Sequence, residues 1–183
     1  LLGTGLIVNS LALYLMSGFT LHVDFSYVLW TRIIQGFGLA FFFVPCGTLA
    51  LSTIARERMG NATSIFNMVR NIGGSFGVAF ATTLLSQRSQ FHHSRLAENM
   101  SLLNERMLWA YYKIITALGL RGLDEVSSST GALELLYGEL NRQARMLAFN
   151  DVFWLFSVIF TVLVLTLLLV RPADSARRIQ TPH

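Results

Sequence analysis

The sequence contains few charged residues and almost no cysteine, and both shortages limit what the chain can be. Aspartate, glutamate, lysine and arginine together make up 13% of the 183 residues, whereas a soluble domain usually has about 25%. The single cysteine, Cys46, excludes an intrachain disulfide and any metal cluster built on cysteines. Hydrophobic residues make up 53% of the chain and the mean hydropathy is +0.53. This composition is typical of a membrane protein.

The sequence also lacks the short motifs that mark common catalytic sites. It has no P-loop, no GxSxG, no HExxH and no pair of carboxylates placed for acid–base chemistry. Gly36-x-Gly38 lacks the third glycine and the preceding strand of a nucleotide-binding fingerprint. The pair His92-His93 has no further ligand at a metal-binding spacing. We therefore expect no enzyme activity, no cofactor and no metal site.

Four apolar segments are long enough to cross a membrane, which takes about 20 helical residues. We expect transmembrane helices at about residues 1–19, 28–53, 61–86 and 147–170. The chain starts with Leu1 inside an apolar segment, without the basic region of a signal peptide. We therefore expect a piece of a longer polytopic protein, whose missing N-terminal spans would be partners of this one.

Residues 87–146 form a connection far longer than usual loops, so we expect it to contain structure of its own. Apolar residues recur at steps of three and four, which predicts an amphipathic helix: Leu96, Met100, Leu103, Met107, Tyr111, Ile114 and Leu118. A turn-rich segment follows at 119–131. From Ala132 we expect a second helix, continuous with the last apolar segment, with Leu133, Leu136, Leu140 and Leu147 on one side. The two helices would form an external helical hairpin.

The arginines predict the orientation of the chain. The short connection 54–60 carries two arginines and the tail 171–183 carries three, whereas the turn 20–27 carries none. The positive-inside rule places the first two in the cytoplasm. Residues 87–146 are then external. The net charge of +4 is explained by this topology and does not indicate nucleic-acid binding.

The third apolar segment carries Arg70 near its middle. A buried arginine there costs at least ~2.5 kcal/mol unless a partner or water compensates. One side of the expected helix is polar or small: Ser64, Asn67, Arg70, Asn71, Gly74 and Gly77. The opposite side is bulky and apolar: Ile65, Phe66, Val69, Ile72, Phe76 and Phe80. Arg70, Asn67 and Asn71 either line a transport pathway, which we favour, or lock two helices together.

Other residues in the spans are candidates for the pathway or for helix packing. Arg32 and Gln35 lie on one face of the second segment, although Arg32 could also snorkel outward. Small residues and a proline are expected to shape helix packing: Gly36, Pro45, Gly73, Gly74 and Gly77. Pro45 should kink its helix near Phe41. Apart from Ser157, Thr161 and Thr166, the last segment is hydrophobic all round, and it is expected at the edge of the bundle against lipid. Asp151 at its entry could cap it or pair with Arg145.

Two runs of sequence carry a family resemblance. RIIQGFGLAFFFVPCGTLALS from Arg32 and ARERMGNATSIFNMVRNIGGSFGVAFATTLL from Ala55 resemble the major facilitator superfamily, and within it the fourteen-span drug:proton antiporters. Arg32, Gln35, Gly36 and Gly38 are similar to the family's motif B, and the glycines from Gly73 to Gly77 echo motif C without its proline. The long connection before the last span implies that this chain holds spans eleven to fourteen.

The resemblance implies an all-α bundle in a bacterial inner membrane that exports amphipathic compounds in exchange for protons. This chain would form part of the wall of the substrate cavity. In Gram-negative members the family implies a periplasmic adaptor and an outer-membrane channel as partners, and 87–146 would lie on their side. Two alternatives stay open at this point: a carrier for a metabolite, and a truncated membrane remnant that does not transport.

Overall fold

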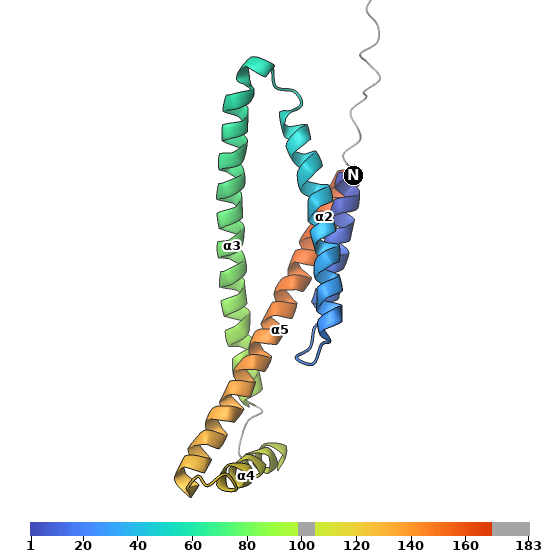
Figure 1. The fold of residues 1–183 in the computed structure, drawn as a ribbon. Helices are drawn as coiled ribbons and strands as arrows, with labels where there is room; N and C mark the ends of the chain where they lie inside the picture. Colours follow the sequence, from blue (N-terminus) through green and yellow to red (C-terminus); the bar gives the residue numbers. More distant parts are fainter. Residues whose placement is uncertain (99–104, 170–183) are drawn as a thin grey trace, which may run out of the picture. The chain divides into compact units, whose positions relative to one another are not determined.

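The computed structural model describes residues 1–98 and 105–169, and every regular element in these ranges is helical (Figure 1). The elements are α1 (Leu2–Met16), α2 (Phe25–Leu51), η1 (Arg56–Arg58), α3 (Met59–Glu98), α4 (Glu105–Gly119) and α5 (Glu125–Leu169). The expectation of an all-α protein is therefore confirmed for these ranges. The predicted basic tail, 171–183, lies outside the described residues.

The chain divides into two compact units, which we describe separately. One consists of Leu1–Met16, Asp24–Ser64 and the chain from Trp154 onward, and the other of Ser17–Val23 and Ile65–Phe153. The long helices α3 and α5 each contribute residues to both units.

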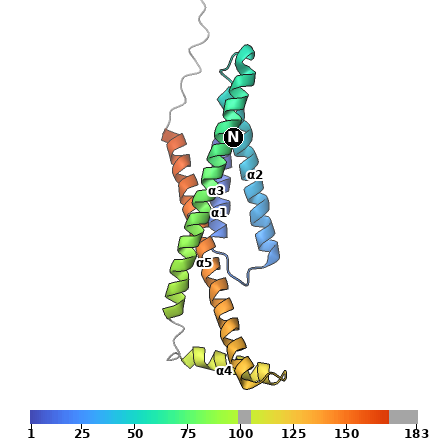
Figure 2. The same cartoon turned by 90° about the vertical axis from the view of Figure 1, so that its left-hand side faces the viewer.

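In the first unit, α1 and α2 lie side by side (Figures 1 and 2). Asp24 caps α2, because its carboxylate accepts a hydrogen bond of 3.1 Å from the backbone N–H of Ser26. This cap explains why α2 begins at Phe25, three residues before the predicted start. The helix continues through Pro45 to Leu51. The predicted kink near Phe41 stays a prediction.

The second unit is organised along one line of α5. The buried residues that α5 contributes to this unit recur every four positions, interrupted only by the partly exposed Leu136: Ser128, Ala132, Leu140, Ala144, Ala148 and Val152. The leucines predicted on one side of this helix differ in burial, because Leu140 is buried whereas Leu133 is 52% and Leu147 38% exposed. Small side chains let another segment approach the helix axis closely, so the buried line follows the alanines and the leucines flank it.

A short turn joins α4 to α5 (Figure 2). The backbone N–H of Leu123 donates to the carbonyl of Leu118, and Gly122 adopts the left-handed conformation, with φ of 88°. Asp124 then accepts a hydrogen bond from the backbone of Ser127 in the first turn of α5. Hydrogen bonds from Ser127 lower the pKa of the Asp124 carboxyl from its ordinary value.

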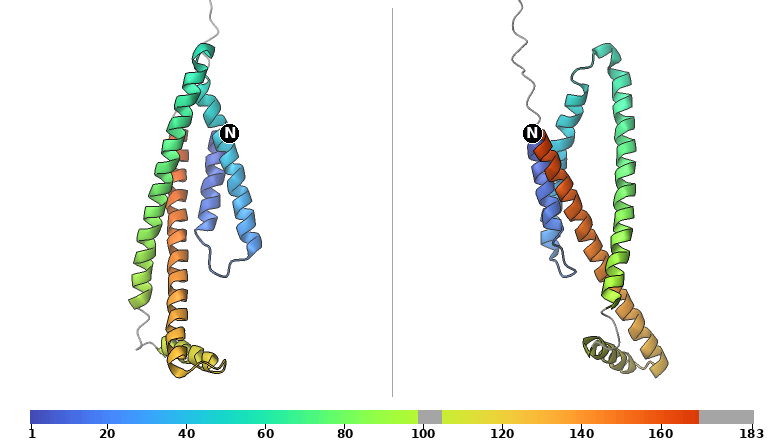
Figure 3. Two further views of the ribbon diagram at one scale, coloured as in Figure 1. Left: turned by 60° about the vertical axis from the view of Figure 1, so that its left-hand side comes forward. Right: turned by 180° about the vertical axis from the view of Figure 1, so that it is seen from behind.

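The long connection differs from the prediction in where its helices begin. Leu96 belongs to the end of α3, which runs without a break from Met59 to Glu98 (Figure 3). Met100 and Leu103, two members of the predicted stripe, lie outside the described residues. The amphipathic helix itself is α4, which starts at Glu105.

Within residues 1–98 and 105–169, two helices are long and apolar enough to cross a membrane, α2 and α5. α1 is apolar but has 15 residues. α3 has 40 residues, and its polar stripe with Arg70 lowers its hydropathy. Membrane crossing by α1 and α3, and hence the count of four spans, stays a prediction.

Candidate functional site

The polar stripe of α3 is exposed, and from Asn67 onward it lies in the second unit. Arg70, Asn71 and Gly74 lie on the exposed surface of this helix, together with Ser75, Val78 and Ala79. Asn67 is one helical turn before Asn71 and is exposed like it. That these residues line a transport pathway stays a prediction.

The apolar side of α3 is equally uncovered. No residue of this helix is buried, and Phe76 is 77% exposed. Such a long apolar surface marks contact with lipid or with another helix. Much of the apolar side of α3 is therefore exposed in the described part of the chain.

Arg32 and Gln35 lie on α2 in the first unit. The Arg32 guanidinium Nη1 donates a hydrogen bond of 3.1 Å to Gln35 Oε1. The spacing of three residues brings these two side chains together, as expected for one face of a helix. Arg32 is exposed and Gln35 is partly exposed.

Glycines make the closest helix contact in the first unit, but at other positions than predicted. A Cβ built on Gly5 would lie 2.8 Å from backbone atoms of Phe41 and Phe42, and one on Gly38 would lie 3.0 Å from Asn9. α1 and α2 therefore cross where both lack a side chain. The packing glycines predicted from sequence were Gly36, Gly73, Gly74 and Gly77. At these positions a Cβ meets nothing within 4 Å in the described chain, so their packing role stays a prediction about another partner.

A cluster of hydroxyl groups ties α1 to α5 in the first unit. Ser10 Oγ lies 2.7 Å from Thr161 Oγ1 and donates a bond of 3.1 Å to the carbonyl of Ser157, while Ser157 Oγ donates one of 2.9 Å to the carbonyl of Ser10. Ser157 is 5% exposed. Ser157 and Thr161 are two of the three polar residues that the sequence shows in this otherwise apolar segment, and both take part in this contact. The position of the segment at the edge of the bundle stays a prediction.

Asp151 on α5 binds two cationic or basic side chains of α3. Its Oδ2 accepts a hydrogen bond of 2.8 Å from Arg88 Nε and lies 2.6 Å from His92 Nε2. The pairing of Asp151 with Arg145 that the sequence left open is not the one observed. Among the described residues, no group of three or more His, Cys, Asp or Glu side chains could hold a metal ion.

The comparison with protein families decides what kind of chain this is. The family model described as Major Facilitator Superfamily matches residues 1–97. This chain belongs to the major facilitator superfamily. Membership in this family of transporters points to a transporter and not to an enzyme.

Several relatives of this superfamily member are multidrug export or resistance proteins. Multidrug export protein EmrB of Escherichia coli K12 is 31% identical over 142 residues, which are 78% of this chain and 26% of the relative. Colistin resistance protein EmrB of Acinetobacter baumannii is 27% identical over 160 residues, 86% of this chain and 30% of the relative. Fatty acid resistance protein FarB of Neisseria gonorrhoeae is 26% identical over 159 residues, with 87% and 30% covered.

The chain thus spans between a quarter and a third of the length of the curated relatives that it matches. No solved structure matches it.

Proposed function

We propose that this chain is the C-terminal part of a proton-coupled multidrug exporter of a bacterial inner membrane. It supplies four spans and part of the wall of the substrate cavity. The observation that carries this proposal is the exposed polar stripe of α3, where Asn67, Arg70 and Asn71 lie on a helix of membrane-spanning length with no buried residue. Charged groups persist at membrane depth mainly where they face a partner or a water-filled pathway.

In this proposal each polar group of the stripe has a role. Arg70 is the fixed positive charge of the pathway, and it attracts electron-rich parts of a substrate or the carboxylate of another span. Asn67, one turn before Arg70, and Asn71, the residue after it, hydrogen-bond the same ligand. Arg32 and Gln35, joined by their hydrogen bond of 3.1 Å, form a second polar point on α2.

The named relatives support the substrate class. Their names describe multidrug export and resistance to colistin and to fatty acids, so we assign amphipathic compounds to this chain as well. A secondary transporter binds its substrate near the midplane between its repeats, so the missing spans supply the other walls. We place the second unit's helices α4 and early α5 on the external side, where a periplasmic adaptor and an outer-membrane channel would dock.

Drug efflux under a controlled proton gradient tests the proposal. The full-length protein that contains this chain is expressed in a drug-sensitive bacterium, and efflux of a fluorescent amphipathic dye is followed in energised cells. We expect efflux above that of the empty-vector strain, and its loss when an ionophore collapses the gradient. Efflux that continues without a proton gradient, or an unchanged dye level, contradicts the proposal.

A further inference from the structure

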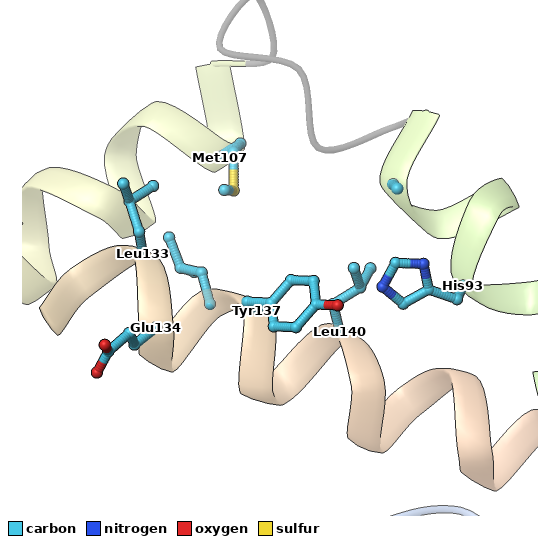
Figure 4. Close-up of a pocket in the computed structure, with 8 residues that line it drawn as sticks. His93, Met107, Leu133, Glu134, Tyr137 and Leu140 are labelled. Atoms are coloured by element: carbon cyan, nitrogen blue, oxygen red, sulfur yellow. The ribbon is translucent and has the colours of Figure 1, made fainter. Parts of the chain in front are cut away.

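A cavity lies away from the α3 polar stripe, in the part of the second unit formed by α4 and by the facing residues of α3 and α5. It has a volume of about 520 Å³ (Figure 4), within the roughly 300–1,000 Å³ typical of small-molecule sites. α3 contributes His93 and Ala97, and α4 contributes Met107. The remaining wall comes from α5: Leu133, Glu134, Leu136, Tyr137 and Leu140.

One polar atom at this cavity has no partner. His93 Nε2 is buried and forms no hydrogen bond within the described residues. Its ring meets the ring of Tyr137 edge to face, with centroids 5.5 Å apart. Figure 4 shows the His93 imidazole pointing from α3 toward Tyr137 and Leu140 on α5. Because buried polar groups are nearly always hydrogen-bonded, this nitrogen is a ready contact for a bound group.

The polar side of the site is rich in donors. A smaller cavity of about 280 Å³ adjoins the same His93 and Tyr137, and it is otherwise lined by Ser89, Gln90 and Asn141. Each of these side chains can donate a hydrogen bond, and none of them carries a negative charge. The one carboxylate of the larger cavity, Glu134, points away from His93 (Figure 4). The polar end therefore suits a group that accepts hydrogen bonds.

We propose that this pair of cavities is an accessory binding site for a single-chain amphiphile with an acidic head. Its apolar body occupies the larger cavity against Met107, Leu136 and Leu140, and its carboxylate accepts hydrogen bonds from His93 and its polar neighbours. A cationic head finds no carboxylate in the smaller cavity. The site shares no residue with the Arg70 stripe, so it stands or falls independently of the proposed transport pathway.

Binding of a fluorescent fatty-acid analogue to the purified protein in lipid nanodiscs tests the site. The probe is 11-(dansylamino)undecanoic acid, and 1,11-diaminoundecane dansylated at one end, which keeps a free ammonium group, is the comparison of opposite charge. We expect saturable binding of the acid, and His93→Phe should weaken it about tenfold while the ring remains. Leu136→Trp, which fills the apolar cavity, should abolish saturable binding.

Matched variants separate this site from general effects on folding. His22→Phe changes an exposed histidine, and Leu135→Trp changes a leucine that is 56% exposed, next to Leu136. Both should leave the affinity for the acid unchanged. Three results would each overturn the proposal. They are an affinity of the His93→Phe and Leu136→Trp variants for the acid equal to that of the wild-type protein, binding of the amine as tight as that of the acid, and only non-saturable partitioning of the acid into the lipid.

Discussion

At the scale of single residues, Asp151 is the point where α5 holds α3 in the second unit. One carboxylate oxygen serves both Arg88 and His92. The pair with Arg88 is partly solvated, since the two side chains are 44% and 30% exposed. Screening by water limits the energy of such a pair to about 0–1 kcal/mol.

Replacing Asp151 with Asn should therefore weaken the protein modestly. The variant keeps the size of the side chain but loses the charge that both partners use, and we expect a loss of about 0.5–1 kcal/mol. Thermal unfolding of the purified protein should show a midpoint lowered by roughly 1–4 °C. Glu139→Gln is the matched control, because its pair with Arg142 is 3.8 Å long and exposed. An equal shift in both variants would contradict the assigned role of Asp151.

Asp124 gives a second prediction at the residue scale. The lowered pKa of its carboxyl decides in which direction the stability of this region changes with pH. A carboxyl whose pKa is lower in the folded state stabilises the fold above its ordinary pKa, and this contribution is lost as pH falls through the lowered value. The start of α5 should therefore fray in acid. Amide hydrogen exchange of the first turn, corrected for intrinsic rates, should show protection falling below about pH 4.

The variant Asp124→Ala tests the cap of α5, which is the hydrogen bond from the Ser127 backbone N–H to the Asp124 carboxylate. It should reduce protection in that turn at neutral pH and remove the acid-dependent change. The pH dependence should be retained in Asp24→Ala, which removes the cap of α2 instead. A turn of α5 that loses protection in acid equally with and without Asp124 would refute the cap as the cause.

At the scale of elements, the crossing of α1 and α2 depends on two glycines. A methyl group at Gly5 would press on the backbone of α2 at 2.8 Å, and a backbone cannot move aside as a flexible side chain can. We expect Gly5→Ala to cost about 1–3 kcal/mol. Gly138→Ala in α5, where a Cβ meets nothing within 4 Å in the described chain, should keep or raise stability because alanine favours helix. Thermal unfolding in detergent compares the two, and the opposite order would contradict the packing.

The elements also show how far sequence reasoning reached. Periodicity and length predicted helices in the right places, since apolar segments are strong signals. The predicted ends of the helices were less accurate. α3 continues to Glu98, about twelve residues beyond the end of the apolar run from which its span was predicted. The residues after Leu85 contain no proline or glycine up to Glu98, so nothing ends the helix there.

Tertiary pairings were beyond reach for a different reason. Ser10 and Ser157 are 147 positions apart, and a lone serine in each apolar segment does not reveal its partner. The same holds for Gly5, which was one of several glycines in an apolar segment. Asn67, Arg70 and Asn71 lie on one helix, where spacing of three or four residues places side chains on one side, but whether this side lines a pathway stays a prediction.

At the scale of the whole molecule, this chain belongs to the major facilitator superfamily and covers 26–30% of the length of its named relatives. The exposed polar and apolar sides of α3 fit this: in our proposal the remaining spans and lipid cover them. Arg70 is the residue on which the proposed pathway depends, and its substitution tests the account most directly.

The decisive measurement is proton-driven dye efflux by the full-length protein carrying Arg70→Ala, Arg70→Lys or Arg56→Ala, normalised to the amount of protein in the membrane. The account predicts that Arg70→Ala lowers the efflux rate at least about tenfold at normal membrane levels. Arg70→Lys should lower the rate less, because lysine keeps the charge but not the planar fork. Arg56→Ala, in the connection before α3, should leave the rate unchanged. Full efflux by Arg70→Ala would contradict the account and show that Arg70 is dispensable. Disappearance of the folded Arg70→Ala protein from the membrane would also contradict it and show that the role of Arg70 is structural.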